Sequence, residues 1–197
     1  LGNLGVNARA GKGNHFVIEA DEYDRMFLGL KPHIAVVTNL EHDHPDCYPT
    51  PQAMLQAFAQ FVQRVPSTGC LICCADEQSV LELSQSRQSA TTPNQALAQA
   101  RTIRYGLTDA AEWRASKVQK TGAQTRFQAS WRGEPVAWFD LPAPGDHNIR
   151  NALAALAVAG KLGLSWEAAG RALRAFRGVQ RRFERKGERD GVLVIDD

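Results

Sequence analysis

Residues 16–24 read FVIEADEYD and residues 36–46 read VVTNLEHDHPD. Each stretch begins as an apolar run typical of a buried strand and ends in carboxylates, joined in the second by histidine. In an open α/β sheet, ligands collect at the carboxyl ends of parallel strands. We therefore expect Glu19 and His44 at the rim of one crevice, where a carboxylate and an imidazole suit a Mg²⁺ or Mn²⁺ ion holding nucleotide phosphates. Further carboxylates add negative charge beside them: Asp21, Glu22, Asp43 and Asp46.

The first half of the chain alternates between strand and helix signals. After the strand expected at residues 16–20, the pattern predicts a short helix within 24–31, a strand over 33–39, an amphipathic helix over 49–65, a strand over 69–75 and a helix over 77–86. Residues 88–95 are polar and predict a surface loop. This rhythm favours a parallel sheet covered by helices.

The second half begins with short alternating segments at 102–105, 113–118, 125–131 and 136–139, which predict an antiparallel meander. Helices are expected over 147–162 and after Ser165, and a terminal hairpin over 183–186 and 192–195. The predicted fold class is α/β, a mostly parallel sheet flanked by helices with an added antiparallel β meander.

Composition excludes some partners. With 197 residues the chain need form only one domain, and its net charge of +2 is too small to imply nucleic acid. No apolar run approaches the roughly 18 residues that a membrane span needs. The C-x-x-C pair Cys70 and Cys73 could suggest a metal or redox site, but strand alternation points them to opposite faces, so we interpret them as core residues of a reduced, cytoplasmic protein.

Four blocks occur in order along the chain: EADEYD at 19–24, VVTNLEHDHPD at 36–46, GDHNIRNA at 145–152 and GVQRRFE at 178–184. Together they resemble the central, ATP-binding domain of the Mur ligases, which form amide bonds in peptidoglycan precursor synthesis. Within that family they are most similar to the branch that adds L-alanine to UDP-N-acetylmuramate through an acyl phosphate. The resemblance implies an enzyme that uses ATP and Mg²⁺, with UDP-N-acetylmuramate and L-alanine as substrates.

The resemblance also implies roles for particular residues. Glu19 and His44 match the magnesium ligands and are expected to be catalytic, although polar residues at strand ends also satisfy loop backbone. Asn148 matches an adenine contact, with His147 and Asn151 beside it, and capping of the helix is the alternative role of Asn148. Arg182 matches a catalytic arginine that reaches the ATP phosphates, a task suited to a planar guanidinium, and its neighbour Arg181 could be confused with it.

One departure from the family concerns its phosphate-binding loop, Gly-x-x-Gly-Lys-Ser/Thr, which the family places upstream. Gly11-Lys12-Gly13 resembles the tail of that loop but lacks the hydroxyl residue. The chain also opens without methionine and closes on a strand. We therefore expect residues 1–197 to be a central domain that lacks this loop and the flanking N- and C-terminal domains, and to be inactive alone.

Two other functions stay open. Tyr23 is shared with the ligases that recycle the murein tripeptide, so the acceptor could be that peptide rather than L-alanine. A catalytically silent module that binds a nucleotide or a partner protein would keep the same fold.

Overall fold

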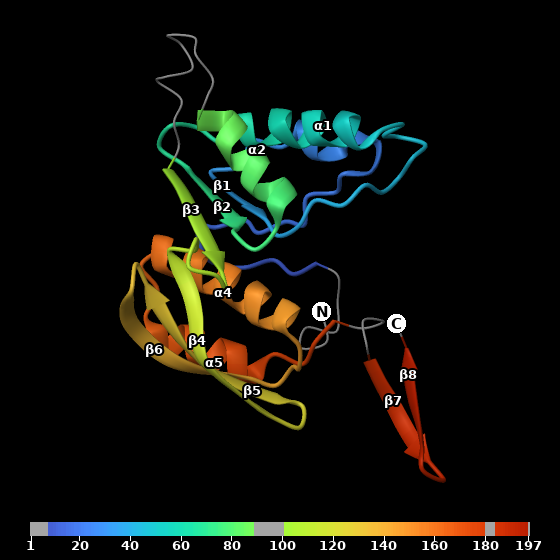
Figure 1. Cartoon of the computed structure of the whole chain (residues 1–197), viewed down its shortest axis with the longest axis vertical. Coiled ribbons are helices and arrows are strands. Elements are labelled where there is room, and N and C mark those ends of the chain that lie inside the picture. The colour runs from blue at the N-terminus through green and yellow to red at the C-terminus, as the bar shows by residue number, and fades with distance from the viewer. Residues whose placement is uncertain (1–7, 89–100, 180–183, 197) are drawn as a thin grey trace.

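The computed structural model describes residues 8–88, 101–179 and 184–196, which form a main body around one six-stranded sheet and a separate hairpin (Figure 1). The sheet follows chain order from β1 to β6. The first four strands pair in parallel: β1 (Ile34–Val37), β2 (Cys70–Cys74), β3 (Arg101–Gly106) and β4 (Trp113–Thr121). Two more extend the sheet as an antiparallel meander, β5 (Gln124–Trp131) and β6 (Glu134–Leu141). The predicted fold class is confirmed.

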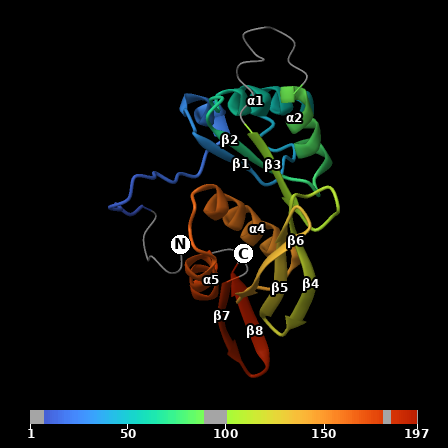
Figure 2. The ribbon, with the colours of Figure 1, turned by 90° about the vertical axis from the view of Figure 1, so that its left-hand side faces the viewer.

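Helices cover both faces of the parallel strands (Figures 1 and 2). On one face lie α1 (Pro51–Gln63), α2 (Gln78–Gln88) and the short 3₁₀ helix η1 (Tyr23–Gly29). On the other lies α4 (Asp146–Lys161), while α5 (Trp166–Ala175) packs against β6. Every residue of β2 is buried, as expected for a strand covered on both faces.

The cysteines of β2 confirm the interpretation made from strand alternation. Cys70 belongs to the core on the α4 side of the sheet, and Cys73 to the core on the α1 side. Burial raises the pKa of the Cys73 thiol to about 12, so it stays protonated and inert.

Two helices begin at hydroxyl caps, and only the cap at Ser165 was predicted. The Thr50 hydroxyl accepts a hydrogen bond from the backbone N–H of Ala53 at 3.1 Å, with Pro51 in the first turn of α1. Ser165 does the same for α5, accepting from the N–H of Ala168 at 3.2 Å. Arg171 and Arg174 on α5, and Arg177 just after it, are all exposed.

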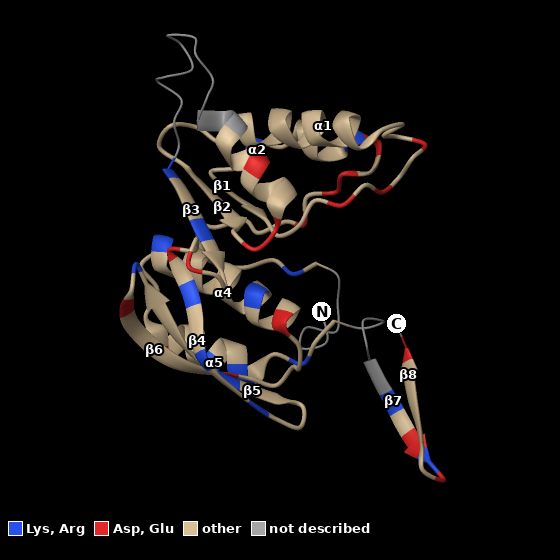
Figure 3. Ribbon diagram, viewed as in Figure 1, with Lys and Arg blue, Asp and Glu red and all other residues tan. Residues whose placement is uncertain are grey.

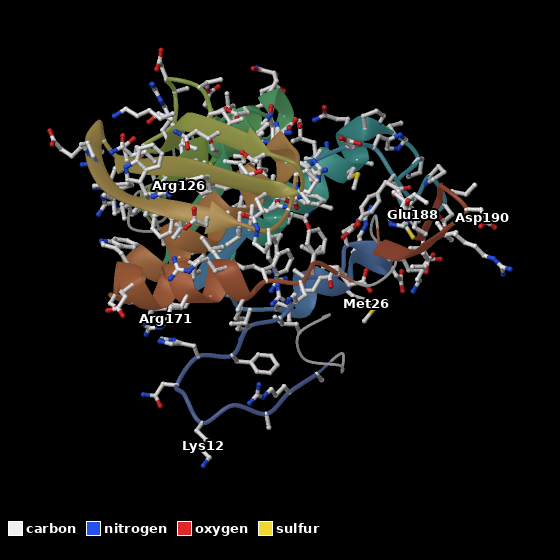
Figure 4. The ribbon with its side chains drawn as sticks, turned by 90° about the horizontal axis from the view of Figure 1, so that it is seen from below. Lys12, Met26, Arg126, Arg171, Glu188 and Asp190 are labelled. Carbon is white, nitrogen blue, oxygen red and sulfur yellow. The ribbon has the colours of Figure 1, made fainter. Side chains whose placement is uncertain are left out.

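The prediction of a strand over residues 16–20 is wrong. This segment is extended but joins no ladder, and Phe16 and Val17 are 87% and 90% exposed. Figures 2 and 4 show it looping away from the body, with Lys12 pointing into solvent. An extended chain becomes a strand only where a neighbour completes its hydrogen bonds. β1 is the outer strand of the described sheet, and none of the described residues pairs with its free edge.

Of three further predicted elements, one is corrected, one is confirmed and one lies almost wholly outside the described residues. Residues 102–105, predicted to open the antiparallel meander, instead form β3, which pairs in parallel with both neighbours. The terminal hairpin is confirmed as β7 (Glu184–Arg189) and β8 (Val192–Asp196), a sheet of its own. Nearly all of the loop predicted at 88–95 lies outside the described residues.

Asp76, just after β2, ties the carboxyl ends of β2 and β3 together. Its carboxylate accepts hydrogen bonds from the backbone N–H of Leu107 at 2.8 Å and from the N–H and hydroxyl of Thr108 at 3.1 and 2.9 Å. We expect Asp76→Ala to lower the free energy of unfolding by about 1–3 kcal/mol, because three hydrogen bonds between the ends of β2 and β3 lose their charged acceptor. Urea denaturation measures this. The exposed Glu134→Ala is the control, and an equal loss in both variants would contradict this role of Asp76.

Candidate functional site

The loop after β1 turns sharply at His44. Its backbone has a φ of 53°, a left-handed conformation that is uncommon outside glycine. The backbone carbonyl of His44 accepts from the N–H of Cys47 at 2.9 Å and of Tyr48 at 2.8 Å, which closes the turn. The imidazole is half-buried, with its Nε2 3.6 Å from Glu22 Oε1 and 3.8 Å from Asp43 Oδ2. Two carboxylates and one imidazole thus gather at the carboxyl end of β1.

The two acidic stretches lie against each other. The Tyr23 hydroxyl donates to Asp46 Oδ2 at 3.0 Å, and the Tyr23 ring meets the His44 ring edge-on, with centroids 5.2 Å apart. The Tyr48 hydroxyl donates to the backbone carbonyl of Glu22. The hydrogen bond from Tyr23 lowers the pKa of Asp46, and the same bond raises the pKa of Tyr23. Figure 3 shows the resulting band of acidic residues on the loops beside β1 and α1.

Glu19, the other predicted magnesium ligand, lies on the exposed extended segment and makes no contact with His44 in the described structure. Among the described residues no group of three or more His, Cys, Asp or Glu side chains is arranged to hold a metal ion. The carboxylate nearest to the His44 ring is that of Glu22, which the sequence presented only as additional charge. The sequence pattern thus located the acidic run correctly but did not determine which of its carboxylates faces His44.

The start of α4 carries the predicted adenine contacts. Gly145 precedes the helix with a φ of 94°, and the His147 ring folds over it so closely that a Cβ there would lie 2.6 Å from the ring. Asn148 is half-buried, and its side-chain amide donates to the carbonyl of Pro144 at 2.6 Å. It therefore braces the loop before α4 rather than capping the helix. Asn151 is exposed one turn later.

An ion pair that the sequence did not single out joins this helix to the end of β2. Arg150 Nη1 lies 3.0 Å from Glu77 Oε1, and both side chains are about one-third exposed. Nearby, the buried hydroxyl of Tyr105 has no hydrogen-bond partner among the described residues, and burial raises its pKa. Arg150 thus holds the first turn of α4 at the carboxyl edge of the parallel strands.

Asp146 and Lys120 form an ion pair at the helix start, with Lys120 Nζ 2.8 Å from Asp146 Oδ1. The hydrogen bond from Lys120 holds the pKa of Asp146 below its ordinary value. Since the folded-state pKa is the lower one, the pair stabilises the fold at neutral pH, and this contribution is lost as the pH falls through the folded-state pKa. Lys120→Gln is expected to return the Asp146 pKa toward its ordinary value in a carboxyl-carbon NMR titration. Lys117→Gln on the same strand is the control, and an unchanged Asp146 titration in Lys120→Gln would refute the coupling.

Arg182 and its neighbour Arg181 lie outside the described residues, so their expected contact with phosphate stays a prediction. Within the described part of the chain, no helix combines the length and the apolar character needed to cross a membrane.

Comparison with known proteins adds to this geometry. A family model described as the Mur ligase middle domain matches residues 5–159. The UDP-N-acetylmuramate–L-alanine ligase of Salinibacter ruber is 42% identical over 194 residues, which is 98% of this chain and 38% of that protein. The chain spans about two fifths of the length of the curated relatives it matches.

Solved structures share the fold. The UDP-N-acetylmuramate–alanine ligase of Thermotoga maritima superposes with a TM-score of 0.69 at 24% identity, covering 90% of this chain and 37% of that one. The UDP-N-acetylmuramate:L-alanyl-gamma-D-glutamyl-meso-diaminopimelate ligase from Neisseria meningitides superposes with a TM-score of 0.69 at 29% identity. The match covers 84% of this chain and 49% of that one.

Proposed function

The chain belongs to the Mur ligase family, and on that premise we propose that it is the central domain of an ATP-dependent ligase that joins L-alanine to UDP-N-acetylmuramate. The observation that carries the proposal is the similarity, over nearly the whole chain, to the Salinibacter ligase of that name. In the proposed reaction ATP phosphorylates the muramyl carboxylate and leaves as ADP. The amine of L-alanine then displaces phosphate to form the amide.

We propose that Glu19 and His44 bind the magnesium ion that accompanies ATP. Mg²⁺ in nucleotide sites keeps several waters and takes one or two protein ligands beside the phosphates, so it needs no cluster of three protein groups. The carboxylate is the donor type that Mg²⁺ prefers, the imidazole is proposed as its second protein ligand, and Glu22 and Asp43 beside His44 add negative charge that attracts a cation. When bound, the ion neutralises phosphate charge.

We propose that residues at the start of α4, together with Arg182, bind ATP. His147, Asn148 and Asn151 lie at the start of α4, where side-chain amides are available to an adenine edge, and Gly145 leaves room for the His147 ring. Arg182 is proposed to contact the phosphates, as a guanidinium that can make paired hydrogen bonds. The UDP-sugar and the amino acid are proposed to bind flanking N- and C-terminal domains of the same protein.

The proposed location is the cytoplasm. All four cysteines are free, three of them buried in β2, which fits a reducing compartment.

The proposal is tested by phosphate release from the full-length protein with ATP, Mg²⁺ and UDP-N-acetylmuramate. We expect release with L-alanine and little with the murein tripeptide. Release with the tripeptide alone would assign the protein to the recycling branch, which the likeness to the Neisseria ligase makes the second candidate. Silence with both acceptors would contradict the ligase proposal and favour a module without turnover.

A further inference from the structure

A cavity of about 330 Å³ lies near the end of α4, away from the proposed ATP site. Its walls include three indole rings, those of Trp113 on β4, Trp131 on β5 and Trp166 at the start of α5. Lys161 at the rim and His147 at the opposite end of the helix are about 21 Å apart at a rise of about 1.5 Å per residue. No residue of the proposed active site lines this cavity, which we call the tryptophan pocket.

The indoles of the tryptophan pocket are held in place by their mutual packing. The Trp113 ring lies 5.4 Å from the Trp131 ring and 5.3 Å from the Trp166 ring, in tilted and edge-on arrangements. Gly160 makes this possible, because a Cβ there would approach Trp166 to 2.9 Å and Trp113 to 3.1 Å. Three secondary-structure elements thus contribute aromatic walls to a partly open pocket, and its volume falls within the range of about 300–1,000 Å³ found for small-molecule sites.

The charged residues that line the pocket are both cations, Arg101 and Lys161. The Arg101 guanidinium lies 5.5 Å from the centre of the Trp131 ring, and within the described residues neither cation is paired with a carboxylate. Arg132 stacks on the same ring at 5.0 Å, but it is neutralised by Glu112 at 2.7 Å. The pocket therefore repels a cationic guest, although aromatic walls alone would suit one.

We propose that the tryptophan pocket binds a small planar organic anion, an aromatic ring carrying a carboxylate. The ring would stack among the indoles, and the carboxylate would meet Arg101 and Lys161 at the rim. A guanidinium oriented by stacking on Trp131 can pair with both carboxylate oxygens. This site is independent of the proposed ligase activity.

The chain offers its own reporters for a test. It contains four tryptophans, of which three line the pocket, while Trp138 lies on β6 with 38% of its surface exposed. We would titrate the 197-residue chain with 2-naphthoate and follow the four indole N–H signals by ¹H–¹⁵N NMR, assigned through single Trp→Phe variants. The signals of Trp113, Trp131 and Trp166 should shift together, with a Kd on the order of 1 mM or tighter, while that of Trp138 stays in place.

Charge is tested separately from apolar contact. Neutral 2-naphthamide should bind about tenfold more weakly, and the double variant Arg101→Gln with Lys161→Gln should weaken 2-naphthoate to a similar degree. The matched control is Arg126→Gln. Arg126, labelled in Figure 4, does not line the pocket and stacks on Trp138 at 5.4 Å, so this variant should leave affinity unchanged. The proposal is overturned if no pocket signal shifts, if Trp138 shifts equally, or if the amide binds as tightly as the anion.

Discussion

Replacing His44 by alanine in the full-length protein is expected to lower the rate of phosphate release by about 10²–10³-fold. The proposed role of the imidazole is to bind the ion that neutralises phosphate charge as the phosphoryl group moves. Because His44 lies at a surface turn and not in either core, the fold should survive the change. Steady-state release with saturating ATP and UDP-N-acetylmuramate measures the rate, and thermal unfolding checks the fold.

A second variant, His44→Gly, separates loss of the imidazole from distortion of the backbone turn. Its φ of 53° is strained for alanine, so part of any loss could come from a distorted turn. His44→Gly removes the imidazole and relieves that strain, and it should lose as much activity as His44→Ala. If the glycine variant keeps normal turnover, the turn matters and the ligand does not.

Variants of Glu19 and Glu41 test whether a second ligand acts with His44 and whether any acidic residue nearby has the same effect. Glu19→Ala should fall as far as His44→Ala if both bind the ion, whereas the exposed Glu41→Ala, in the same loop as His44, should retain activity. If Glu22→Ala lost activity as fully as His44→Ala while Glu19→Ala kept normal activity, the magnesium ligand would be Glu22, whose carboxylate lies 3.6 Å from His44, and not Glu19.

Much of the fold could be predicted because its signals are local. Ser165 caps α5 as expected from a hydroxyl before an amphipathic run, whereas Thr50, which caps α1, lies inside the range of 49–65 expected for that helix. The alternation of Cys70 and Cys73 between the two cores follows from strand geometry alone. The parallel pairing of β3 could not be predicted in this way, because residues 102–105 look the same whichever neighbour they join.

The candidate site was less predictable, since it depends on contacts between distant segments. The sequence indicated that acidic residues and His44 would meet at a strand end, and the hydrogen bond from Tyr23 to Asp46 joins the two stretches. Which carboxylate faces the imidazole depends on the path of residues 16–24, and that path is tied down by long-range contacts such as the hydrogen bond from the Tyr48 hydroxyl to the Glu22 carbonyl. The ion pair of Arg150 with Glu77 links residues 73 positions apart, and neither residue has a local signal for it.

A pair of phenylalanines tests the path of the first segment. Phe127 on β5 is fully buried, with its ring 6.0 Å from that of Phe139, whereas Phe16 is 87% exposed. Phe127→Ala should lower the free energy of unfolding by about 3–5 kcal/mol, since it removes a core ring and leaves a cavity. Phe16→Ala should change it by no more than about 0.5 kcal/mol, as is usual for surface positions. Urea denaturation of the 197-residue chain gives both values.

The contrast between these variants separates two accounts of residues 16–20. If the segment formed the buried strand that its apolar run suggests, Phe16→Ala would lower the free energy of unfolding by more than about 1 kcal/mol. A small effect would mean that Phe16, Val17 and Ile18 face solvent in the isolated chain, as their exposure indicates. The apolar residues 16–18 and the open edge of β1 would then both be free to pair elsewhere, because neither has the partner that a strand needs among the described residues.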